Sequence, residues 1–217
     1  MKSNFQSRRF YDTVAPEYDE IVGESTYVNE LEPLLAPRVR SIQRVLDVGA
    51  GTGNSIEGIL VWTRPTTIVG VDISKPMLDE LREKYPQVEI VHADILEYLA
   101  RDPEPFDLIT AFSVLELLWD FESVAGALAR KLNSGGIFAF TYEPLLPDHA
   151  TQGLPETTYR VEDEDDLTYT MYRVAPDRVN AWLHRSGLQV IVERTIAQAY
   201  ERDDGAVELC FVAALRP

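Results

Sequence analysis

Three alternating glycines directly after an apolar run constrain the fold of this chain more than any other feature. The run covers residues 44–48, and Gly49, Gly51 and Gly53 follow it where a helix is expected to begin. Glycine adopts positive φ angles and lets the backbone approach a ligand without an intervening Cβ atom. The free amides at the start of the next helix supply hydrogen-bond donors. This glycine bend, residues 49–53, therefore predicts a strand, a tight turn and a helix start that together hold a small molecule.

A second apolar run ends in an acid at the spacing of a ribose-binding site. Residues 67–72 finish at Asp72, about twenty residues after the glycine bend. A carboxylate in that position accepts hydrogen bonds from both hydroxyls of a ribose. The two segments together indicate a cofactor that carries a nucleoside. A helix-capping role is the alternative for Asp72, but Ser74 is the better-placed cap.

Two cofactor classes share this layout. A dinucleotide site reads G-x-G-x-x-G, with the third glycine beside a pyrophosphate. Here Gly53 is followed by Asn54, and Asp47 stands just before the first glycine. A carboxylate at that point would repel a pyrophosphate but would suit a ligand with an ammonium group. A cationic nucleoside cofactor is therefore favoured, and an NAD-type dinucleotide oxidoreductase remains the alternative.

The charge balance excludes several classes of partner. The chain of 217 residues has 36 acidic and 20 basic residues, a net charge of −16, which repels phosphate backbones and anionic lipid. We expect a small-molecule substrate and neither nucleic acid nor membrane as partner. The single Cys210 permits no intramolecular disulfide. Without a leader-like or membrane-spanning apolar stretch, we expect a cytoplasmic, single-domain protein, as a monomer or a homodimer.

The order of elements predicts an α/β fold. Strands are expected at 44–48, 67–72, 88–92, 106–112 and 136–142, and helices at 74–85, 121–132 and 176–186. This alternation is typical of a parallel sheet with helices on both faces. The C-terminal part differs, because strand-like runs at 188–200 and 206–215 follow each other with only Asp203-Asp204-Gly205 between them. That turn predicts an antiparallel hairpin.

These segments resemble a known family in their order and content. Asp47 and the glycine bend resemble motif I of the class I S-adenosylmethionine-dependent methyltransferases. Residues 92–95, 106–117 and 132–138 resemble the segments of that family after its third strand, along its fourth strand and at the turn into its fifth. Residues 11–19 are similar to its aromatic N-terminal stretch. The resemblance implies a Rossmann-like, doubly wound sheet of seven strands, five parallel strands followed by an antiparallel C-terminal hairpin, with helices on both faces.

The resemblance also implies S-adenosyl-L-methionine as the cofactor and a set of residues that bind it. Asp72 would take the ribose, Asp94 the adenine amino group, and Ile95 would flank the ring, although Asp94 is also a common type of helix start. We expect a cofactor ammonium, with the loop amides, to satisfy Asp47. The expected cofactor site comprises Tyr11, Tyr18, Asp47, Gly49, Ala50, Gly51, Gly53, Asn54, Asp72, Ile73, Met77, Asp94, Ile95, Phe112, Ser113 and Leu117.

The chemistry of methyl transfer leaves fewer signals in the sequence. In-line displacement on an activated carbon requires alignment, exclusion of water and a base where the acceptor holds a proton. Glu116, Glu143 and His149 are the candidate catalytic residues, because all three follow the fourth and fifth strands. Residues 143–175 are too long for an ordinary connection, so we expect an insertion over the active site. Residues 1–40 are expected to form a lid, in which Tyr11 and Tyr18 either cover the cofactor or serve as surface anchors.

Within the insertion, an acidic run at 162–166 precedes alternating Thr and Tyr residues. The run suits either a solvated face or a lip that attracts a cationic substrate, and the alternation suggests an added strand pair over the pocket. Because no cluster with octahedral metal-ligand spacing is visible, we expect no metal. The sequence after the fourth strand, Ser113-Val114-Leu115-Glu116, matches family members that methylate small metabolites at oxygen, nitrogen or carbon. A non-catalytic binding protein with the same fold is the further alternative.

Overall fold

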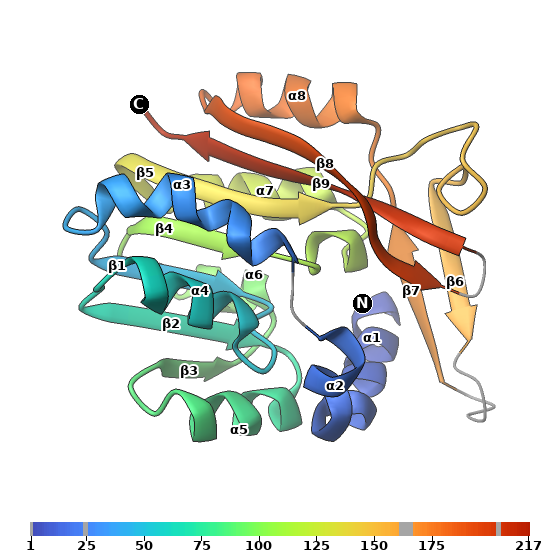
Figure 1. Ribbon diagram of the computed structural model, residues 1–217, viewed down its shortest axis with the longest axis horizontal. Helices are drawn as coiled ribbons and strands as arrows, with labels where there is room; N and C mark the ends of the chain where they lie inside the picture. Colours follow the sequence, from blue (N-terminus) through green and yellow to red (C-terminus); the bar gives the residue numbers. More distant parts are fainter. Residues whose placement is uncertain (1, 24–25, 161–166, 203–204) are drawn as a thin grey trace.

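Seven strands form one sheet in the order β3-β2-β1-β4-β5-β9-β8 in the computed structural model (Figure 1). The structure describes residues 2–23, 26–160, 167–202 and 205–217. Strands β1 to β5 pair in parallel, and β9 runs antiparallel to both β5 and β8. The expected fold class is confirmed, while Asp203 and Asp204 of the expected turn lie outside the described residues. The strands are β1 Arg44–Val48, β2 Thr67–Asp72, β3 Glu89–His92, β4 Phe106–Ala111, β5 Leu132–Tyr142, β8 Gln189–Arg202 and β9 Gly205–Leu215.

The sheet reverses its direction of growth between β1 and β4. From β1 the chain proceeds outward to β2 and β3, and then returns to place β4 on the other side of β1. At such a switch point the loops after the two central strands leave toward opposite faces and open a crevice for a ligand. The connecting helices are α4 Asn54–Trp62, α5 Lys75–Lys84, α6 Ile95–Ala100, α7 Phe121–Ala129 and α8 Pro176–Arg185.

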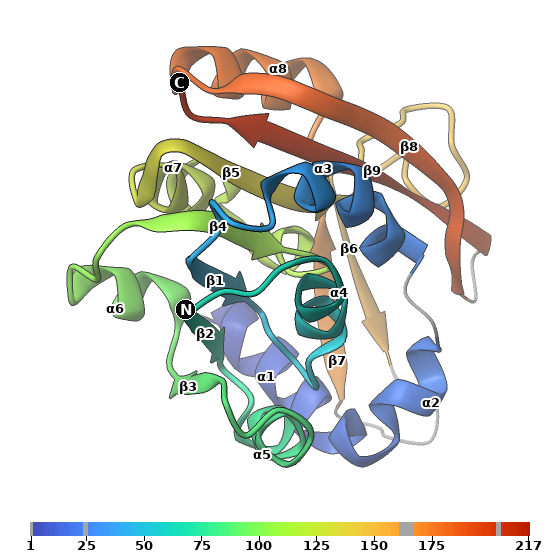
Figure 2. The ribbon, with the colours of Figure 1, turned by 60° about the vertical axis from the view of Figure 1, so that its left-hand side comes forward.

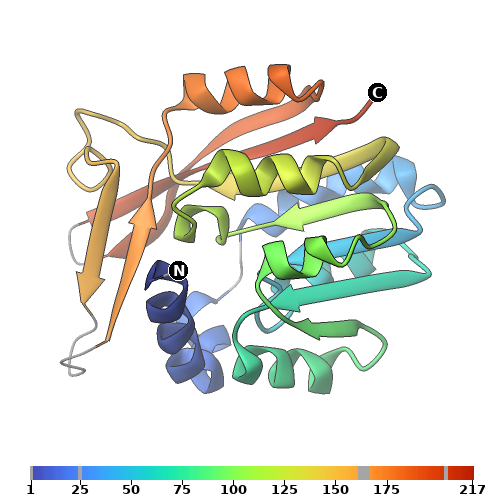
Figure 3. The same cartoon turned by 180° about the vertical axis from the view of Figure 1, so that it is seen from behind.

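Alternate residues of the central strands face two separate cores. In β1, Val45 belongs to the core that includes residues of α3 (Glu32–Leu35), α4 and α5, and Leu46 belongs to the core that includes residues of α6, α7 and α8. The side chains of a strand point alternately to its two faces, so runs of apolar residues can fill both cores. Figure 1 shows α3 and α4 in front of the sheet, and Figure 3, from behind, shows α6, α7 and α8. Two short 3-10 helices, η2 Thr26–Leu31 and η3 Ala36–Arg38, flank α3.

Two excursions lie beyond the carboxyl ends of the parallel strands. The N-terminal one consists of α1 Lys2–Val14, η1 Ala15–Glu17 and α2 Tyr18–Val22. The other, in the insertion, is the antiparallel pair β6 Glu156–Arg160 and β7 Thr168–Tyr172. This confirms the added strand pair, whereas the acidic run at 162–166 lies outside the described residues. Helix α1 packs against β7 and against η4 (Leu115–Leu117), and Figure 2 shows α1 and β7 side by side.

The boundary between α7 and β5 differs from the expectation. A helix was expected to continue to residue 132 and the next strand to begin at residue 136, but α7 ends at Ala129 and β5 already begins at Leu132. The amide of Phe106 donates to the carbonyl of Lys131 over 2.8 Å, and Gly135 donates to Arg216 over 2.7 Å. Pairing with β4 and the C-terminal segment thus draws the glycine-rich stretch into the sheet. None of the helices in the described ranges has the length and apolar composition needed to cross a membrane.

Candidate active site

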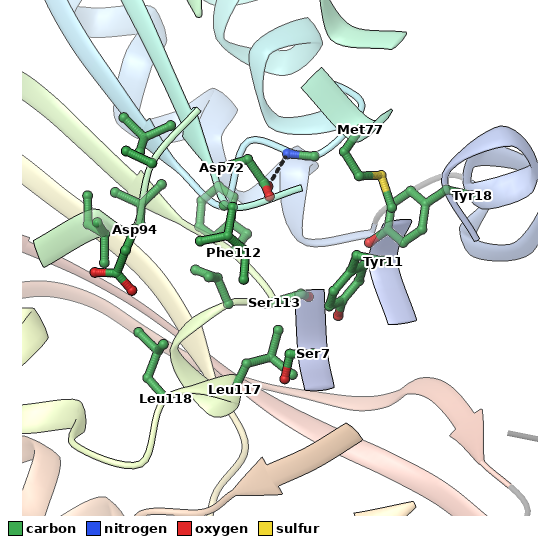
Figure 4. Close-up of a pocket in the computed structure, with 18 residues that line it drawn as sticks. Ser7, Tyr11, Tyr18, Asp72, Met77, Asp94, Phe112, Ser113, Leu117 and Leu118 are labelled. Carbon is green, nitrogen blue, oxygen red and sulfur yellow. Dashed lines mark hydrogen bonds between the residues drawn. The ribbon is translucent and has the colours of Figure 1, made fainter. Parts of the chain in front are cut away.

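A cavity opens at the carboxyl ends of β1, β2 and β4, beneath α1 (Figure 4). The space between its lining atoms amounts to about 750 Å³, a volume that includes the part open to solvent. Ala50 and Asn54 line an adjoining hollow that shares Gly49 and Gly51 with it. Of the residues expected to bind the cofactor, those that line the main cavity are Tyr11, Tyr18, Gly49, Gly51, Asp72, Ile73, Met77, Asp94, Ile95, Phe112, Ser113 and Leu117.

The glycines of the bend serve two different purposes. Gly51 has a φ of +52° and lines the cavity, and a Cβ atom there would meet only the Gly49 oxygen, at 3.9 Å. Any side chain at this position would therefore project into the ligand space. Gly53 lines neither cavity: with a φ of +102°, its Cβ would lie 2.7 Å from Leu81 and 2.8 Å from Tyr85. Gly53 thus lets α5 pack closely against the start of α4, which is a packing role.

Asp72 ties the glycine bend to the end of β2. Its Oδ2 accepts a 2.9 Å hydrogen bond from the amide of Gly51, drawn as a dashed line in Figure 4, and its Oδ1 accepts one of 2.8 Å from the amide of Ser74. Burial raises the pKa of Asp72 above its ordinary value, although these backbone donors act in the opposite direction. A carboxylate has about four lone-pair sites. Backbone amides, including that of Ile73, take up most of them and fix the side chain, which leaves limited capacity for hydroxyls of a ligand.

Asp94 caps a helix and also lines the cavity. Its Oδ1 accepts a hydrogen bond of 2.8 Å from the amide of Leu96, so Asp94 is the N-cap of α6. The same residue lines the cavity together with Ile95. Capping fixes the position of the side chain and leaves acceptor capacity for an exocyclic amino group. Contact with adenine stays a prediction.

Asp47 is satisfied by protein hydroxyls instead of loop amides. Ser55 in α4 donates to its Oδ2 over 2.5 Å, and Thr110 in β4 donates to its Oδ1 over 2.6 Å. The amides of Gly49 and Ala50 donate to the carbonyl of Val71 instead. Asp47 is 1% exposed and lines neither cavity, and burial raises its pKa to about 6. Its effect on a cofactor ammonium would therefore act through the field of the carboxylate or through water.

The N-terminal helices are fastened over the cavity by polar contacts. Ser74 donates to Oδ1 of Asp12 over 2.7 Å, and Thr52 donates to Oδ1 of Asp19 over 2.5 Å. Asp19 also forms an ion pair with Lys84. Between these contacts, Tyr11 and Tyr18 line the cavity with ring centroids 6.1 Å apart. Burial raises the pKa of Tyr11 well above its ordinary value, so its phenol keeps its proton at neutral pH.

The three candidate catalytic residues lie in different environments. Glu116 is 2% exposed in η4, beside the cavity-lining Leu117, and its charge contributes to the raised pKa of Tyr11. Glu143 is fully buried in an ion pair in which Arg173 Nε donates to its Oε2 over 3.0 Å. His149 contacts Thr151 through Nδ1, and Thr151 in turn donates to the carbonyl of Ala206 in β9. The described cavity lining contains neither Glu143 nor His149.

Comparisons with known proteins identify the family. Residues 45–136 match a family described as the methyltransferase domain. A trans-aconitate 2-methyltransferase of Methylobacterium nodulans is 32% identical over 194 residues, which cover 85% of this chain and 71% of that protein. The chain belongs to the class I S-adenosylmethionine-dependent methyltransferases.

Other methyltransferases extend the comparison. The ubiquinone biosynthesis O-methyltransferase of Klebsiella pneumoniae is 29% identical over 141 residues, covering 60% of this chain and 57% of that protein. The magnesium protoporphyrin IX methyltransferase of Synechocystis, crystallised with the demethylated cofactor, matches in fold with a TM-score of 0.69 at 16% identity. The match covers 99% of this chain and all of that one, 100%. The chain is therefore an enzyme that uses S-adenosylmethionine on a small molecule, and the alternatives, a dinucleotide oxidoreductase and a non-catalytic binding protein, are not supported.

Several residues that line the cavity of this methyltransferase were not expected from the sequence. Ser7 is 3% exposed, and its hydroxyl has no hydrogen-bond partner among the described residues. Val114 and Leu118, on either side of η4, complete the same wall. The sequence of residues 106–117 predicted that this segment lies at the site. The sequence around Ser7 is polar and does not indicate that this serine is buried.

Proposed function

We propose that this methyltransferase binds S-adenosylmethionine along the carboxyl ends of β1 to β4 and methylates a small metabolite held beneath α1. The ribose would lie on Asp72, the adenine between Asp94 and Ile95, and the methionine end over the glycine bend. The observation that carries this proposal is the hydrogen bond from Gly51 to Asp72. It joins the bend and the ribose acid into one preformed unit, whose open side faces the cavity.

The charges of the cavity suit this cofactor. S-adenosylmethionine carries an ammonium and a sulfonium, and carboxylates stabilise cations that approach in a partly dehydrated site. Asp72 and Asp94 line the cavity, and Asp47 lies directly behind the bend. A pyrophosphate at the same position would meet these carboxylates with the wrong sign. The carboxylates around the cavity thus fit a cationic methyl donor better than a dinucleotide.

The cofactor supplies a methyl group already activated by the sulfonium, so the protein must mainly align the acceptor and exclude water. Tyr11 and Tyr18 close the cavity from above, and η4 forms its wall. Of the three candidate bases, Glu116 alone adjoins the cavity lining, so we propose it for removal of a proton from the acceptor. Glu143 is engaged by Arg173, and we propose a structural role for it.

The remaining features follow the sequence-based expectations. We propose one domain over residues 1–217, with a lid at 1–40 and an insertion at 143–175 that bounds the active site. The net charge of −16 favours small acceptors over nucleic acid. A cytoplasmic location and a monomeric or homodimeric state complete the proposal.

Calorimetric titration tests the donor site directly. We expect micromolar binding of S-adenosylmethionine and S-adenosylhomocysteine, and no binding of NAD. Transfer of a radiolabelled methyl group to a panel of small acceptors then tests the reaction. The panel includes trans-aconitate, because the relative from Methylobacterium nodulans is named for it. Folded protein that binds neither S-adenosylmethionine nor S-adenosylhomocysteine would contradict the proposal.

A further inference from the structure

The acceptor end of the cavity has walls from α1 and from the segment around η4. Ser7 and Tyr11 reach it from α1, and Val114, Leu117 and Leu118 reach it from the chain after β4 (Figure 4). In Figure 4, Ser7 and Leu117 lie beyond Ser113 as seen from Asp72, which the proposed function assigns to the nucleoside. Aliphatic and phenolic side chains dominate this end, so an acceptor must present a largely apolar body to it.

Ser7 supplies a polar group at this end without an internal partner. Its side chain is 3% exposed, and its Oγ forms no hydrogen bond with the described residues. More than nine in ten buried polar groups have a partner, and an exception asks for an explanation. Ser7 lines the cavity while its Oγ is buried, so a ligand in the cavity can satisfy this hydroxyl after rotation of the side chain about its Cα–Cβ bond. Ser7 is therefore suited to orient an acceptor by one hydrogen bond.

The charge of the cavity excludes one class of acceptor. The described residues that line it include Asp72 and Asp94 but no lysine, arginine or histidine. Glu116, buried in η4, adds a further carboxylate next to Tyr11. An anionic acceptor would therefore find no protein cation in this lining to pair with, and a site that recognises carboxylates typically uses arginine or lysine.

Two arginines in the segments around the cavity, Arg173 and Arg8, are engaged with other protein groups. Arg173 donates to Glu143, to the carbonyl of Leu154 and to the hydroxyls of Thr157 and Tyr159. Arg8 forms an ion pair with Asp12 at the surface of α1. Neither guanidinium lines the cavity. A cation for a carboxylate-bearing acceptor is thus missing from the described walls.

We propose that the acceptor of this methyltransferase is an uncharged or cationic molecule with an apolar body, held by a hydrogen bond to Ser7, and that polycarboxylates are rejected. This proposal rests on the proposed function, since it concerns the acceptor end of the same cavity. The proposed acceptor class differs from the acceptor for which the relative trans-aconitate 2-methyltransferase is named, although both proteins belong to the same family.

A charge series tests the proposal on the intact protein saturated with S-adenosylhomocysteine. Benzamide, benzylamine and benzoate share one ring and a similar size but are neutral, cationic and anionic at pH 7.5. We expect ligand-observed NMR titration to give dissociation constants for benzamide and benzylamine at least tenfold lower than for benzoate. In a transfer assay, trans-aconitate should remain unmethylated. Benzoate binding as tight as that of benzamide, binding of none of the three probes, or methylation of trans-aconitate would overturn the proposal.

The role of Ser7 is tested by Ser7→Ala, with Thr13→Ala as the matched control. Thr13 lies on the same helix but is exposed, and its hydroxyl bonds the carbonyl of Arg9. We expect Ser7→Ala to weaken benzamide binding roughly threefold to tenfold, the range of one net hydrogen bond, and Thr13→Ala to leave it unchanged. Equal affinities in both variants would overturn the role of Ser7.

Binding of S-adenosylhomocysteine is measured on every variant in the same experiments, which separates two kinds of failure. A wild-type protein that does not bind S-adenosylhomocysteine would contradict the proposed function itself. Intact cofactor binding together with a preference for anionic probes contradicts the proposed acceptor class alone.

Discussion

The hydroxyl of Ser74, at the start of α5, donates a 2.7 Å hydrogen bond to Asp12 in α1. Ser74 follows the ribose acid Asp72 by two positions, and its amide donates to that acid. One short segment therefore contacts both the lid and the proposed ribose site. Closing of the N-terminal helices and retention of the cofactor should depend on each other.

Asp12→Ala should accelerate release of the demethylated cofactor. Removal of the carboxylate deletes the bond to Ser74, and one lost hydrogen bond corresponds to roughly a threefold to tenfold change. Displacement of radiolabelled S-adenosylhomocysteine by an excess of the unlabelled compound, followed by rapid filtration, measures the rate. Arg8→Gln is the control, because it removes the ion pair with Asp12 but leaves the bond to Ser74. Equal rates in both variants would show that the contact does not hold the lid.

Asp72→Ala should weaken cofactor binding by roughly 1.5–3 kcal/mol, as expected for hydrogen bonds to a charged group. The variant also frees the amides of Gly51 and Ser74, so some loss of stability accompanies it. Asp79→Ala, on the exposed side of α5 in an ion pair with Lys75, is the matched control. Calorimetry on both variants decides the matter: an unchanged affinity in Asp72→Ala would remove the ribose assignment.

Asp47→Asn should make the fold more stable at pH 8 while weakening binding of the cationic methyl donor. Burial raises the pKa of Asp47 from 3.8 to about 6, so the folded chain holds this proton more tightly than the unfolded chain. Ionisation of Asp47 therefore costs stability as the pH rises from about 4 to about 6, and the cost persists above that range.

At pH 8 the neutral asparagine should gain up to about 3 kcal/mol in unfolding free energy, at 1.36 kcal/mol per unit of pKa. Urea denaturation at pH 8.0 and pH 5.0 measures this difference, which should shrink at the lower pH. An advantage that is the same at both pH values would show that the charge of Asp47 is not its cause.

Glu143→Gln and Arg173→Met should each destabilise the protein by roughly 3–5 kcal/mol, because either change leaves an unpaired group in a buried ion pair. The double variant Glu143→Leu with Arg173→Met should lose less than either single variant. Urea denaturation of all three gives the comparison. If Glu143→Gln abolished methyl transfer without loss of stability, Glu143 would act as a catalytic base instead of a structural partner.

The strands could be predicted well where local pattern and pairing agree. The runs at 44–48 and 67–72 coincide with β1 and β2, since apolar residues that are buried on both faces end at a glycine and at an acid. The hairpin strands are longer than expected, because pairing continues to Arg202 and Gly205 through polar residues that give no apolar signal. A turn into the fifth strand was expected near Gly135 and Gly136, but in the structure both residues are part of β5.

In the candidate site too, local sequence patterns predicted some residues, whereas long-range contacts could not be predicted. The residues at strand ends, such as Asp72 and Asp94, could be predicted because parallel strands bring their carboxyl ends to one edge. The partners of Asp47 and Glu143 could not. Thr110 and Arg173 lie 63 and 30 positions away, and only the folded chain brings them together.

The aromatic contact between Phe10 in α1 and Tyr169 in β7, with ring centroids 4.7 Å apart, has a consequence for engineering. Helix α1, which borders the acceptor space, and strand β7, which packs against α1, come from distant parts of the chain and meet at this contact. A chimera that takes only one of these two segments from a related protein would disrupt the packing between them. Retargeting the enzyme therefore requires transplanting both segments together, while the donor-binding strands stay untouched.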